Sequence, residues 1–322
     1  MNPSDINKLV QDTISEITAG RASKIAILGL TDVALELVKQ FIHLGIAPSV
    51  VAIFTDHQIP KFSPNAIPVL PMQELQNVLP DTLIIASDRE KEEIILSAMP
   101  YVSGTPKIIL AGYAHFEFCD RVLDEIRASL HVPSCATGYK HTLTHIYQCL
   151  QNAHRLGLNG IVVEFGMFKG GTTMLMAKVI HALGAPWKII GFDSFDGFPP
   201  RRSPLDMYDH PGCVFTDLES VKRYFTGERV EIIPGDIVTT ASRLSDERIV
   251  LAFLDTDNFS PASAALKVIR DRVVVGGAIV FDHFTGDQRF RYTLGERLAG
   301  KELLADERYF HLHGTGVFYR QR

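Results

Sequence analysis

The sequence of 322 residues has few cysteines, and their spacing excludes two classes of site. Its four thiols include no Cys-x-x-Cys pair, so neither a zinc knuckle nor a disulfide framework is expected for Cys119, Cys135, Cys149 and Cys213. No apolar run approaches the ~20 residues that cross a bilayer, so we expect no membrane partner. The first ten residues lack the basic and apolar segments of a signal peptide, which favours a cytoplasmic protein.

The chain also lacks an excess of positive charge. It has 32 lysines and arginines and 37 acidic residues. The formal net charge of −5 gives no electrostatic reason to expect nucleic acid as a partner. What the chain does have is an apolar content of 46%, enough for large cores. Its length favours about two domains. These properties are typical of an α/β protein that acts on small molecules, and they leave homo-oligomerisation open.

Residues 24–112 alternate short apolar strands with helices, which predicts a parallel sheet covered on both faces. The first turn, Gly29-Leu30-Thr31-Asp32, has one glycine where a dinucleotide-binding fingerprint has three. Asp56, after the second strand, could instead accept ribose hydroxyls. We therefore expect residues 1–112 to form a degenerate Rossmann-like domain used for packing, dimerisation or substrate capture. A nucleotide or nucleotide-sugar site is the alternative. We expect strands at 24–29, 50–54, 83–86 and 107–110, and helices at 31–44 and 89–99.

Residues 113–159 are expected to be a mainly helical connection between two domains. A helix over 116–130 should end before Pro133, because proline lacks a backbone donor and disfavours helix in the residue before it. A second helix, over 139–156, should lead into the next strand.

From residue 160 onward the alternation of strands and helices restarts and continues to residue 322. The sequence therefore predicts an α/β fold with two Rossmann-like units, and the last two strands should form a hairpin around Gly314-Thr315-Gly316. The strands expected in this domain are 161–165, 188–193, 230–233, 249–255, 277–282, 309–313 and 317–320.

The most informative motif lies at the start of this second series. After an apolar strand comes Glu164-Phe165-Gly166-Met167-Phe168-Lys169-Gly170-Gly171-Thr172-Thr173, which predicts a strand, a tight loop and a helix. The glycines let backbone approach a ligand closely, because they lack a Cβ atom. The spacing matches neither the dinucleotide fingerprint nor the Walker loop. It resembles the Glu-x-Gly-x-x-x-Gly-Gly-Thr form of class I binders of S-adenosylmethionine (SAM).

Amide groups at a helix N-terminus suit a carboxylate. We therefore expect this loop to hold the amino-acid end of SAM through Glu164, Gly166, Lys169, Gly170, Thr172 and Thr173.

Polar residues follow nearly every strand of the second series. Open parallel sheets bind ligands at the carboxyl ends of their strands, so these residues should meet at one edge. One aspartate alone is as well explained as a turn residue; the whole set favours a site. We expect Asp193 and Ser194 near the ribose of SAM and Asp236 near the adenine. The set comprises Glu164, Asp193, Asp236, Asp255, Asp257, Asp282 and His283.

The residues after the fourth and fifth strands form a second group. Asp255, Asp257, Asp282 and His283 can converge on one divalent cation, and carboxylate oxygens suit Mg²⁺. A cation there could bind a substrate hydroxyl and lower its pKa. Methyl transfer is an in-line displacement, so alignment of the oxygen, the methyl group and the sulfur supplies much of the rate.

The region from about residue 139 to 283 resembles the macrocin-type (TylF-like) sugar O-methyltransferases of antibiotic pathways. The similar segments are VVEFGMFKGGTTMLM, GFDSFDGFP, LDTD and IVFDHF. The resemblance implies a seven-stranded class I methyltransferase sheet whose last strand is antiparallel. It also implies a divalent metal, usually magnesium, bound by Asp255 or Asp257 and by Asp282, with Glu164 and Asp193 as SAM contacts.

His283 departs from that family, which commonly has two adjacent acids after the fifth strand. A histidine ligand would shift the metal preference toward Mn²⁺, Fe²⁺ or Zn²⁺. Alternatively His283 is a general base, since its ordinary pKa of about 6.5 suits proton removal at neutral pH. A third alternative is that metal dependence is lost. We favour the general base, with Asp255 as the other catalytic candidate.

The sequence thus predicts a SAM-dependent methyltransferase that acts, with metal assistance, on a hydroxyl of a polar small molecule, such as a sugar or a glycosylated natural product. The alternatives are N-methylation of a related metabolite and a non-catalytic scaffold that binds SAM or a nucleotide. A nicotinamide oxidoreductase is disfavoured by the turn at Gly29. The long loop over 201–216, with Tyr208 and His210, is expected to be a functional lid that contacts the substrate.

Overall fold

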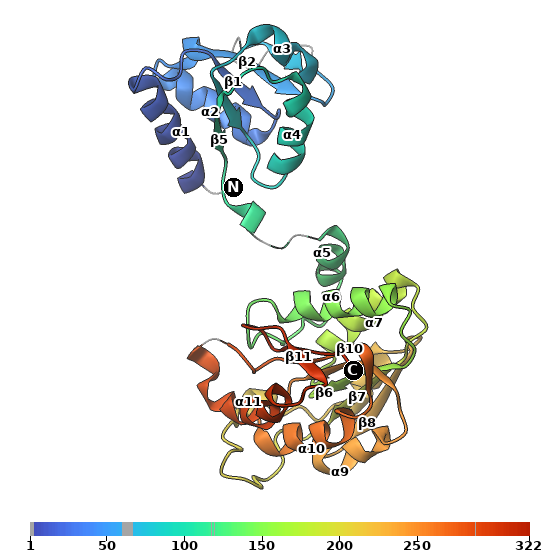
Figure 1. Cartoon of the computed structure of the whole chain (residues 1–322). Coiled ribbons are helices and arrows are strands. Elements are labelled where there is room, and N and C mark those ends of the chain that lie inside the picture. The colour runs from blue at the N-terminus through green and yellow to red at the C-terminus, as the bar shows by residue number, and fades with distance from the viewer. Residues whose placement is uncertain (1–2, 60–66, 117, 119, 287) are drawn as a thin grey trace. The chain divides into compact units, whose positions relative to one another are not determined.

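The computed structural model describes residues 3–59, 67–116, 118, 120–286 and 288–322. The chain divides into two compact units, Met1–Phe118 and Cys119–Arg322 (Figure 1). The helices that we expected to form a separate connection over 113–159 belong to the second unit. No helix of the described residues has both the length and the apolar content to cross a membrane. Among the described cysteines, Cys135, Cys149 and Cys213 are free thiols, and Cys119 lies outside the described residues.

The first unit contains a parallel sheet of five strands in the order β3-β2-β1-β4-β5. Helices α1 and α2 pack on one face of the sheet, and α3 and α4 pack on the other. The four expected strands are present, and β3 was not predicted because it is only three residues long. The strands are β1 (Ile25–Leu28), β2 (Val50–Thr55), β3 (Val69–Pro71), β4 (Thr82–Ile85) and β5 (Lys107–Leu110), and the helices are α1 (Pro3–Thr18), α2 (Asp32–His43), α3 (Leu75–Val78) and α4 (Lys91–Ala98).

The turn after β1 is covered by the unit's own side chains. Thr31 caps α2 by accepting a hydrogen bond from the amide of Ala34 at 3.2 Å, and its hydroxyl donates to the carbonyl of Ala86. The Cδ1 atom of Ile94 lies 2.9 Å from the position that a Cβ on Gly29 would take. In a dinucleotide-binding turn a phosphate approaches here, whereas in this unit an apolar side chain fills the space.

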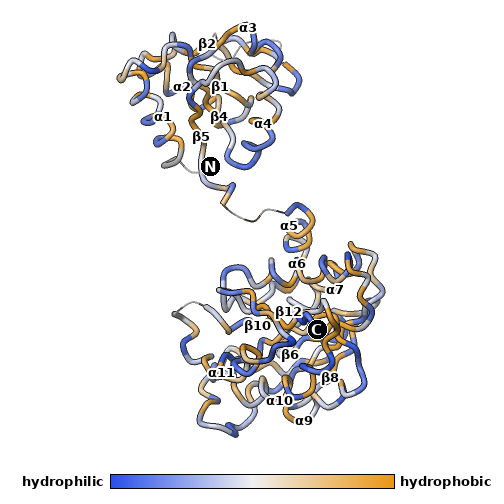
Figure 2. The backbone as a smooth tube through the Cα atoms, in the orientation of Figure 1, coloured by the Kyte–Doolittle hydropathy of each residue, from blue (hydrophilic) through white to orange (hydrophobic). Residues whose placement is uncertain are grey.

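The second unit contains the seven-stranded sheet that the sequence predicted. Its order is β11-β12-β10-β9-β6-β7-β8, and β12 is antiparallel to both of its neighbours while the other pairs are parallel. The predicted fold class is confirmed. The strands are mainly apolar and form the centre of the unit (Figure 2). They are β6 (Ile161–Phe165), β7 (Ile189–Asp193), β8 (Val230–Pro234), β9 (Ile249–Leu254), β10 (Val273–Phe281), β11 (Tyr309–His311) and β12 (Val317–Arg320).

Helices cover both faces of this sheet. One face packs against α5 (Arg121–Ala128), α6 (Thr142–Arg155), α7 (Gly171–Leu183) and α8 (Leu218–Tyr224). The other packs against α9 (Ile237–Thr240), α10 (Phe259–Ile269) and α11 (Leu294–Gly300). Short 3₁₀ segments lie at Ala47–Ser49, Met72–Glu74, Met99–Tyr101, Ala114–Phe116, Pro211–Cys213, Ala241–Leu244, Gln288–Thr293 and Lys301–Leu304.

The helix expected over 116–130 is shorter than predicted. It begins at Arg121 because the side chain of Asp120 caps it, accepting a hydrogen bond from the amide of Leu123 at 3.1 Å. The amphipathic pattern of the sequence predicted the helix, but it did not show this start.

Candidate active site

The loop between β6 and α7 brings backbone from three parts of the second unit together. Gly166 has a φ of +88°, and a Cβ there would lie 1.9 Å from the carbonyl oxygen of Asp255. A Cβ on Gly171 would lie 2.3 Å from the carbonyl oxygen of Pro133. No side chain caps α7, whose N-cap residue is Gly170. The first amides of α7 therefore suit an anionic group, as the sequence predicted.

Glu164 and Asp193 have partners that hold this loop in place. The hydroxyl of Thr173 donates to the buried carboxylate of Glu164. The two carboxylate oxygens of Asp193 accept hydrogen bonds from the amides of Phe168 and Phe195, each at 2.8 Å. A carboxylate oxygen accepts more than one hydrogen bond, so Asp193 can still bind ribose hydroxyls. Burial raises the pKa of Asp193.

Three further residues expected to contact SAM have partners within the second unit. Ser194 donates from its hydroxyl to the carbonyl of Gly197. Asp236 caps α9 through the amide of Val238 at 2.9 Å, and it pairs with Arg202 at 2.7 Å. The ammonium of Lys169 lies 4.9 Å and 5.2 Å from the ring centroids of Phe168 and Phe215, respectively. Their contact with SAM stays a prediction.

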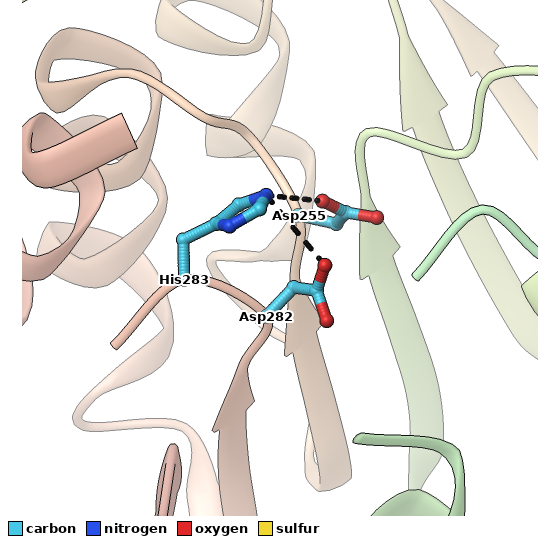
Figure 3. Close-up of side chains that lie close together, drawn as sticks. All are labelled: Asp255, Asp282 and His283. Atoms are coloured by element: carbon cyan, nitrogen blue, oxygen red, sulfur yellow. Dashed lines mark ion pairs between the residues drawn. The ribbon is translucent and has the colours of Figure 1, made fainter. Parts of the chain in front are cut away.

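The residues after β9 and β10 converge, as the sequence predicted for this edge of the sheet. One ligand atom each from Asp255, Asp282 and His283 lies within 4.8 Å of the other two (Figure 3). The Nε2 atom of His283 is 3.6 Å from Asp255 Oδ1, 3.5 Å from Asp282 Oδ2 and 2.9 Å from Asp257 Oδ1. We call Asp255, Asp257, Asp282 and His283 the carboxylate–histidine cluster. Asp257 contacts His283 but lies outside the group of three.

Burial and mutual repulsion set the charges of this cluster. Burial and the neighbouring Asp282 raise the pKa of Asp255, and burial raises the pKa of Asp282. Burial alone would lower the pKa of His283, but hydrogen bonds to Asp255 and Asp257 outweigh it and raise the pKa to about 12. Buried acids gathered in this way favour a bound cation. Two carboxylates and one imidazole are a donor set that fits a divalent metal.

Residues outside the predicted set also hold the cluster. Asp282 accepts hydrogen bonds from the hydroxyl of Thr142 at 2.6 Å and from the amide of Gly138 at 2.8 Å. Glu296, on α11 and fully buried, accepts hydrogen bonds from the backbone amides of Asp257 and His283. Nothing in the sequence distinguishes Glu296 from an exposed helical acid, so sequence reasoning missed it.

One cavity joins the glycine loop to the carboxylate–histidine cluster. It has a volume of about 160 Å³. Glu164 and Gly166 line it from the loop, and Asp255 lines it from the cluster. The lining residues are Val132, Pro133, Cys135, Glu164, Gly166, Met167, Phe168, Lys169, Gly171, Thr172 and Asp255.

The first half of the loop over 201–216 is fixed to the start of α10. The buried carboxylate of Asp206 accepts hydrogen bonds from the amides of Arg202 at 2.9 Å and Ser260 at 2.8 Å. The side-chain amide of Asn258 donates to the carbonyl of Tyr208, and its oxygen accepts from the amide of Tyr208, both at 2.9 Å. Burial and the nearby Asp257 raise the pKa of Tyr208.

His210, the other residue of this loop expected to contact the substrate, binds within its own turn. Its Nδ1 atom accepts a hydrogen bond from the amide of Gly212 at 3.0 Å.

Comparisons with known proteins identify relatives of the second unit. A family model described as Macrocin-O-methyltransferase (TylF) matches residues 128–321. The 8-demethyl-8-(2,3-dimethoxy-alpha-L-rhamnosyl)-tetracenomycin-C 4'-O-methyltransferase of Streptomyces olivaceus is 24% identical over 199 residues, 55% of this chain and 72% of that protein. The mycinamicin III 3''-O-methyltransferase of Micromonospora griseorubida is 24% identical over 157 residues, 44% of this chain and 62% of that protein.

Solved structures are similar as well. That of the O-methyltransferase NovP aligns with a TM-score of 0.47 and 20% identity, covering 56% of this chain and 78% of that one.

Proposed function

Because this chain belongs to the macrocin O-methyltransferase (TylF) family, we propose that it transfers the methyl group of SAM to a hydroxyl of a sugar unit. The acceptor is a free sugar, an activated sugar or the sugar part of a glycosylated natural product. The cavity that joins the glycine loop to Asp255 carries the proposal. A methyl donor and a hydroxyl acceptor must meet in one space with their reacting atoms aligned. The two relatives named above are O-methyltransferases of glycosylated molecules, which supports the choice of acceptor.

In this proposal the glycine loop binds the donor. The amides at the start of α7 bind the carboxylate of SAM, and Glu164 and Asp193 face its amino group and its ribose. The backbone that crosses Gly166 and Gly171 leaves no room for a Cβ atom, which keeps the loop in one conformation. These residues would hold the donor, which would supply the methyl group for transfer to the acceptor.

The carboxylate–histidine cluster binds and activates the acceptor. Asp255, Asp282 and His283 would hold a divalent cation, which would orient the acceptor hydroxyl and lower its pKa. Asp257, beside this set and outside it, is the carboxylate that we assign to take the hydroxyl proton. The raised pKa of His283, about 12, leaves its ring protonated at neutral pH, which argues against the alternative in which His283 is the general base; the ring instead lies 2.9 Å from Asp257 as its ion-pair partner.

The test uses the purified full-length chain. Calorimetry should show binding of SAM. Mass spectrometry should show transfer of one methyl group to a member of a panel of free, nucleotide-linked and macrolide-linked deoxysugars, with a simple phenol and an amino sugar as comparisons. Transfer to the amino group alone would indicate N-methylation instead. EDTA should reduce turnover, and Mg²⁺ or Mn²⁺ should restore it.

Substitution in the cluster separates catalysis from donor binding. Asp282→Asn should lower turnover on the order of 100-fold, as removal of an electrostatic catalytic group does, with the affinity for SAM little changed. Asp271→Asn, at an exposed acid paired with Arg308, is the matched control and should retain activity. If the chain binds SAM and methylates no acceptor, and Asp282→Asn changes nothing, it is a scaffold and the proposal fails.

A further inference from the structure

Glu296 is a buried acid that the methyl-transfer chemistry does not use directly. It lies on α11 and has no exposed surface. Burying a carboxylate is costly unless donors satisfy it. The hydrogen-bond partners of Glu296 must therefore offset the cost of burying it. Each of its described partners belongs to a segment that carries the carboxylate–histidine cluster.

The two carboxylate oxygens of Glu296 reach two different strand exits. Oε2 accepts hydrogen bonds from the turn after β9, namely from the amides of Thr256 at 2.7 Å and Asp257 at 2.9 Å and from the hydroxyl of Thr256 at 3.1 Å. Oε1 accepts a hydrogen bond from the amide of His283 after β10 at 3.0 Å. One side chain thus links the backbone of Asp257 to that of His283.

The backbone of Asp257 is in an unfavourable conformation that these bonds stabilise. Its φ is +60°, in the left-handed region that residues other than glycine rarely adopt and that aspartate tolerates better than most. Such strain persists where the surrounding contacts over-determine it, and it is frequent at functional sites. In this conformation Asp257 Oδ1 lies 2.9 Å from His283 Nε2.

A neighbouring residue of α11 holds the same exit of β10. The guanidinium of Arg297 donates to the carbonyl of Phe284 at 2.7 Å and lies 5.2 Å from the centroid of its ring. Adjacent side chains of one helix therefore bind the amide of His283 and the carbonyl of Phe284. The segment is fixed from α11 rather than by the sheet alone.

We propose that Glu296 is the positioning residue of the active site: it holds the left-handed turn that directs Asp257 at His283, and it fixes the backbone of His283 at the same time. Its role in turnover rests on the proposed function, whereas its role in holding the two turns does not. Without its carboxylate the turn after β9 loses the acceptor of both of its amides, and Asp257 is free to leave the cluster.

The test compares Glu296→Gln with Glu302→Gln in the full-length chain. Glutamine keeps the shape of the side chain but has one acceptor oxygen, so it cannot serve both exits. Glu302 follows the same helix and is 82% exposed, which makes it the matched control. Hydrogen exchange read by mass spectrometry should be faster in Glu296→Gln for peptides over 250–260 and 281–286, and unchanged over 171–183. Glu302→Gln should exchange like the wild type.

Two functional measurements separate positioning from general stability. Mn²⁺ affinity, followed by electron paramagnetic resonance, should fall about 10- to 100-fold in Glu296→Gln, as for other residues that orient metal ligands. The kcat for the acceptor should fall by a similar factor, while the affinity for SAM and the acceptor KM stay within a few-fold. Asp257→Asn in the Glu296→Gln background should add little, because residues that act through one another are not additive.

The outcomes decide between the inference and its alternatives. Wild-type exchange, Mn²⁺ affinity and kcat in Glu296→Gln would overturn it, as would a loss of SAM affinity in proportion to kcat. If Glu296→Gln does not fold, Glu296→Asp replaces it; the shorter acid keeps the charge and should show the same exchange pattern in weaker form. Slow exchange in the wild type and fast exchange in the variant, without any methyl transfer by the wild type, would support Glu296 as the clamp of the two turns and reject the proposed function.

Discussion

Glu164, at the scale of the single residue, is both a candidate contact for SAM and a buried acid. Burial raises its pKa to about 8 in the absence of ligand, although the hydroxyl of Thr173 partly counteracts this effect. The ligand that the loop is proposed to bind carries a positively charged amino group and sulfonium. With a pKa of about 8, Glu164 holds a proton at neutral pH when no ligand is bound. A positively charged ligand beside it would lower this pKa and favour loss of the proton.

The raised pKa predicts how stability depends on pH. The ordinary value is 4.5, so the folded chain binds this proton more tightly than the unfolded chain between 4.5 and about 8. The contribution of Glu164 to stability is fully present below pH 4.5 and is lost as the pH rises toward 8. Glu164→Gln should remove a slope of up to roughly 1.4 kcal/mol per pH unit from the free energy of unfolding. Urea unfolding without SAM at several pH values measures it.

Glu231→Gln is the control for that experiment, because Glu231 is 41% exposed and pairs with Lys188. Its unfolding should follow the wild type across the same range. An identical slope in wild type and Glu164→Gln would show that the folded chain holds this proton no more tightly than the unfolded chain, contrary to the prediction.

At the scale of the element, the loop over 201–216 consists of two differently held halves. Asp206 and Asn258 bind the first half to α10, as described above, and Phe198 packs edge-on against Tyr208 with ring centroids 5.5 Å apart. The proline-containing sequence predicted a lid. The structure shows that residues 202–208 are fixed by the buried polar side chains of Asp206 and Asn258, and a lid role for the loop stays a prediction.

Loss of the hydrogen bonds to Asp206 should make residues 202–208 more sensitive to protease. Asp206→Ala removes the acceptor of four hydrogen bonds to Arg202, Ser203 and Ser260. Trypsin should therefore cut after Arg201 or Arg202 at least about 10-fold faster, since local opening needs on the order of 1.4 kcal/mol less. Mass spectrometry of the fragments locates the cut. Asp209→Ala, at an exposed acid of the same loop, should be cut at the wild-type rate. Equal rates for the two variants would show that Asp206 does not hold the loop.

At the scale of the whole molecule, each unit has its own buried core. The first unit is built around the two faces of its five-stranded sheet, and the second around those of its seven-stranded sheet. The family match, over residues 128–321, lies wholly within the second unit. The methyltransferase machinery therefore belongs to that unit.

The second unit should bind the donor without the first. A fragment that begins at residue 113 retains the whole second unit. We expect it to fold, since a domain with its own core can fold alone, and to bind SAM with an affinity within a few-fold of the full chain. Calorimetry and circular dichroism measure these properties. A folded fragment that does not bind SAM would show that the first unit takes part in donor binding.

The sequence predicted the helices and strands that a local pattern of apolar residues specifies. It missed the features that depend on a cap, on very short strands or on contacts between distant residues. Strand β6 has the predicted bounds, because buried parallel strands are continuous apolar runs. Helix α5 begins five residues later than predicted, because the cap at Asp120 overrides the apolar pattern. Strand β3, three residues long, is too short to carry a periodic signal.

The sequence by itself determined the fold class, the family and the strand ends at which Glu164, Asp193, Asp255 and Asp282 lie, because parallel strands bring their carboxyl ends to one edge. Only the tertiary structure decided how these side chains meet. It places His283 Nε2 among three carboxylates, and it brings in Glu296 from a helix thirteen residues further along the chain. The reason is physical: strand order and burial set the position of a backbone, whereas the direction of a buried side chain depends on the partners that satisfy it.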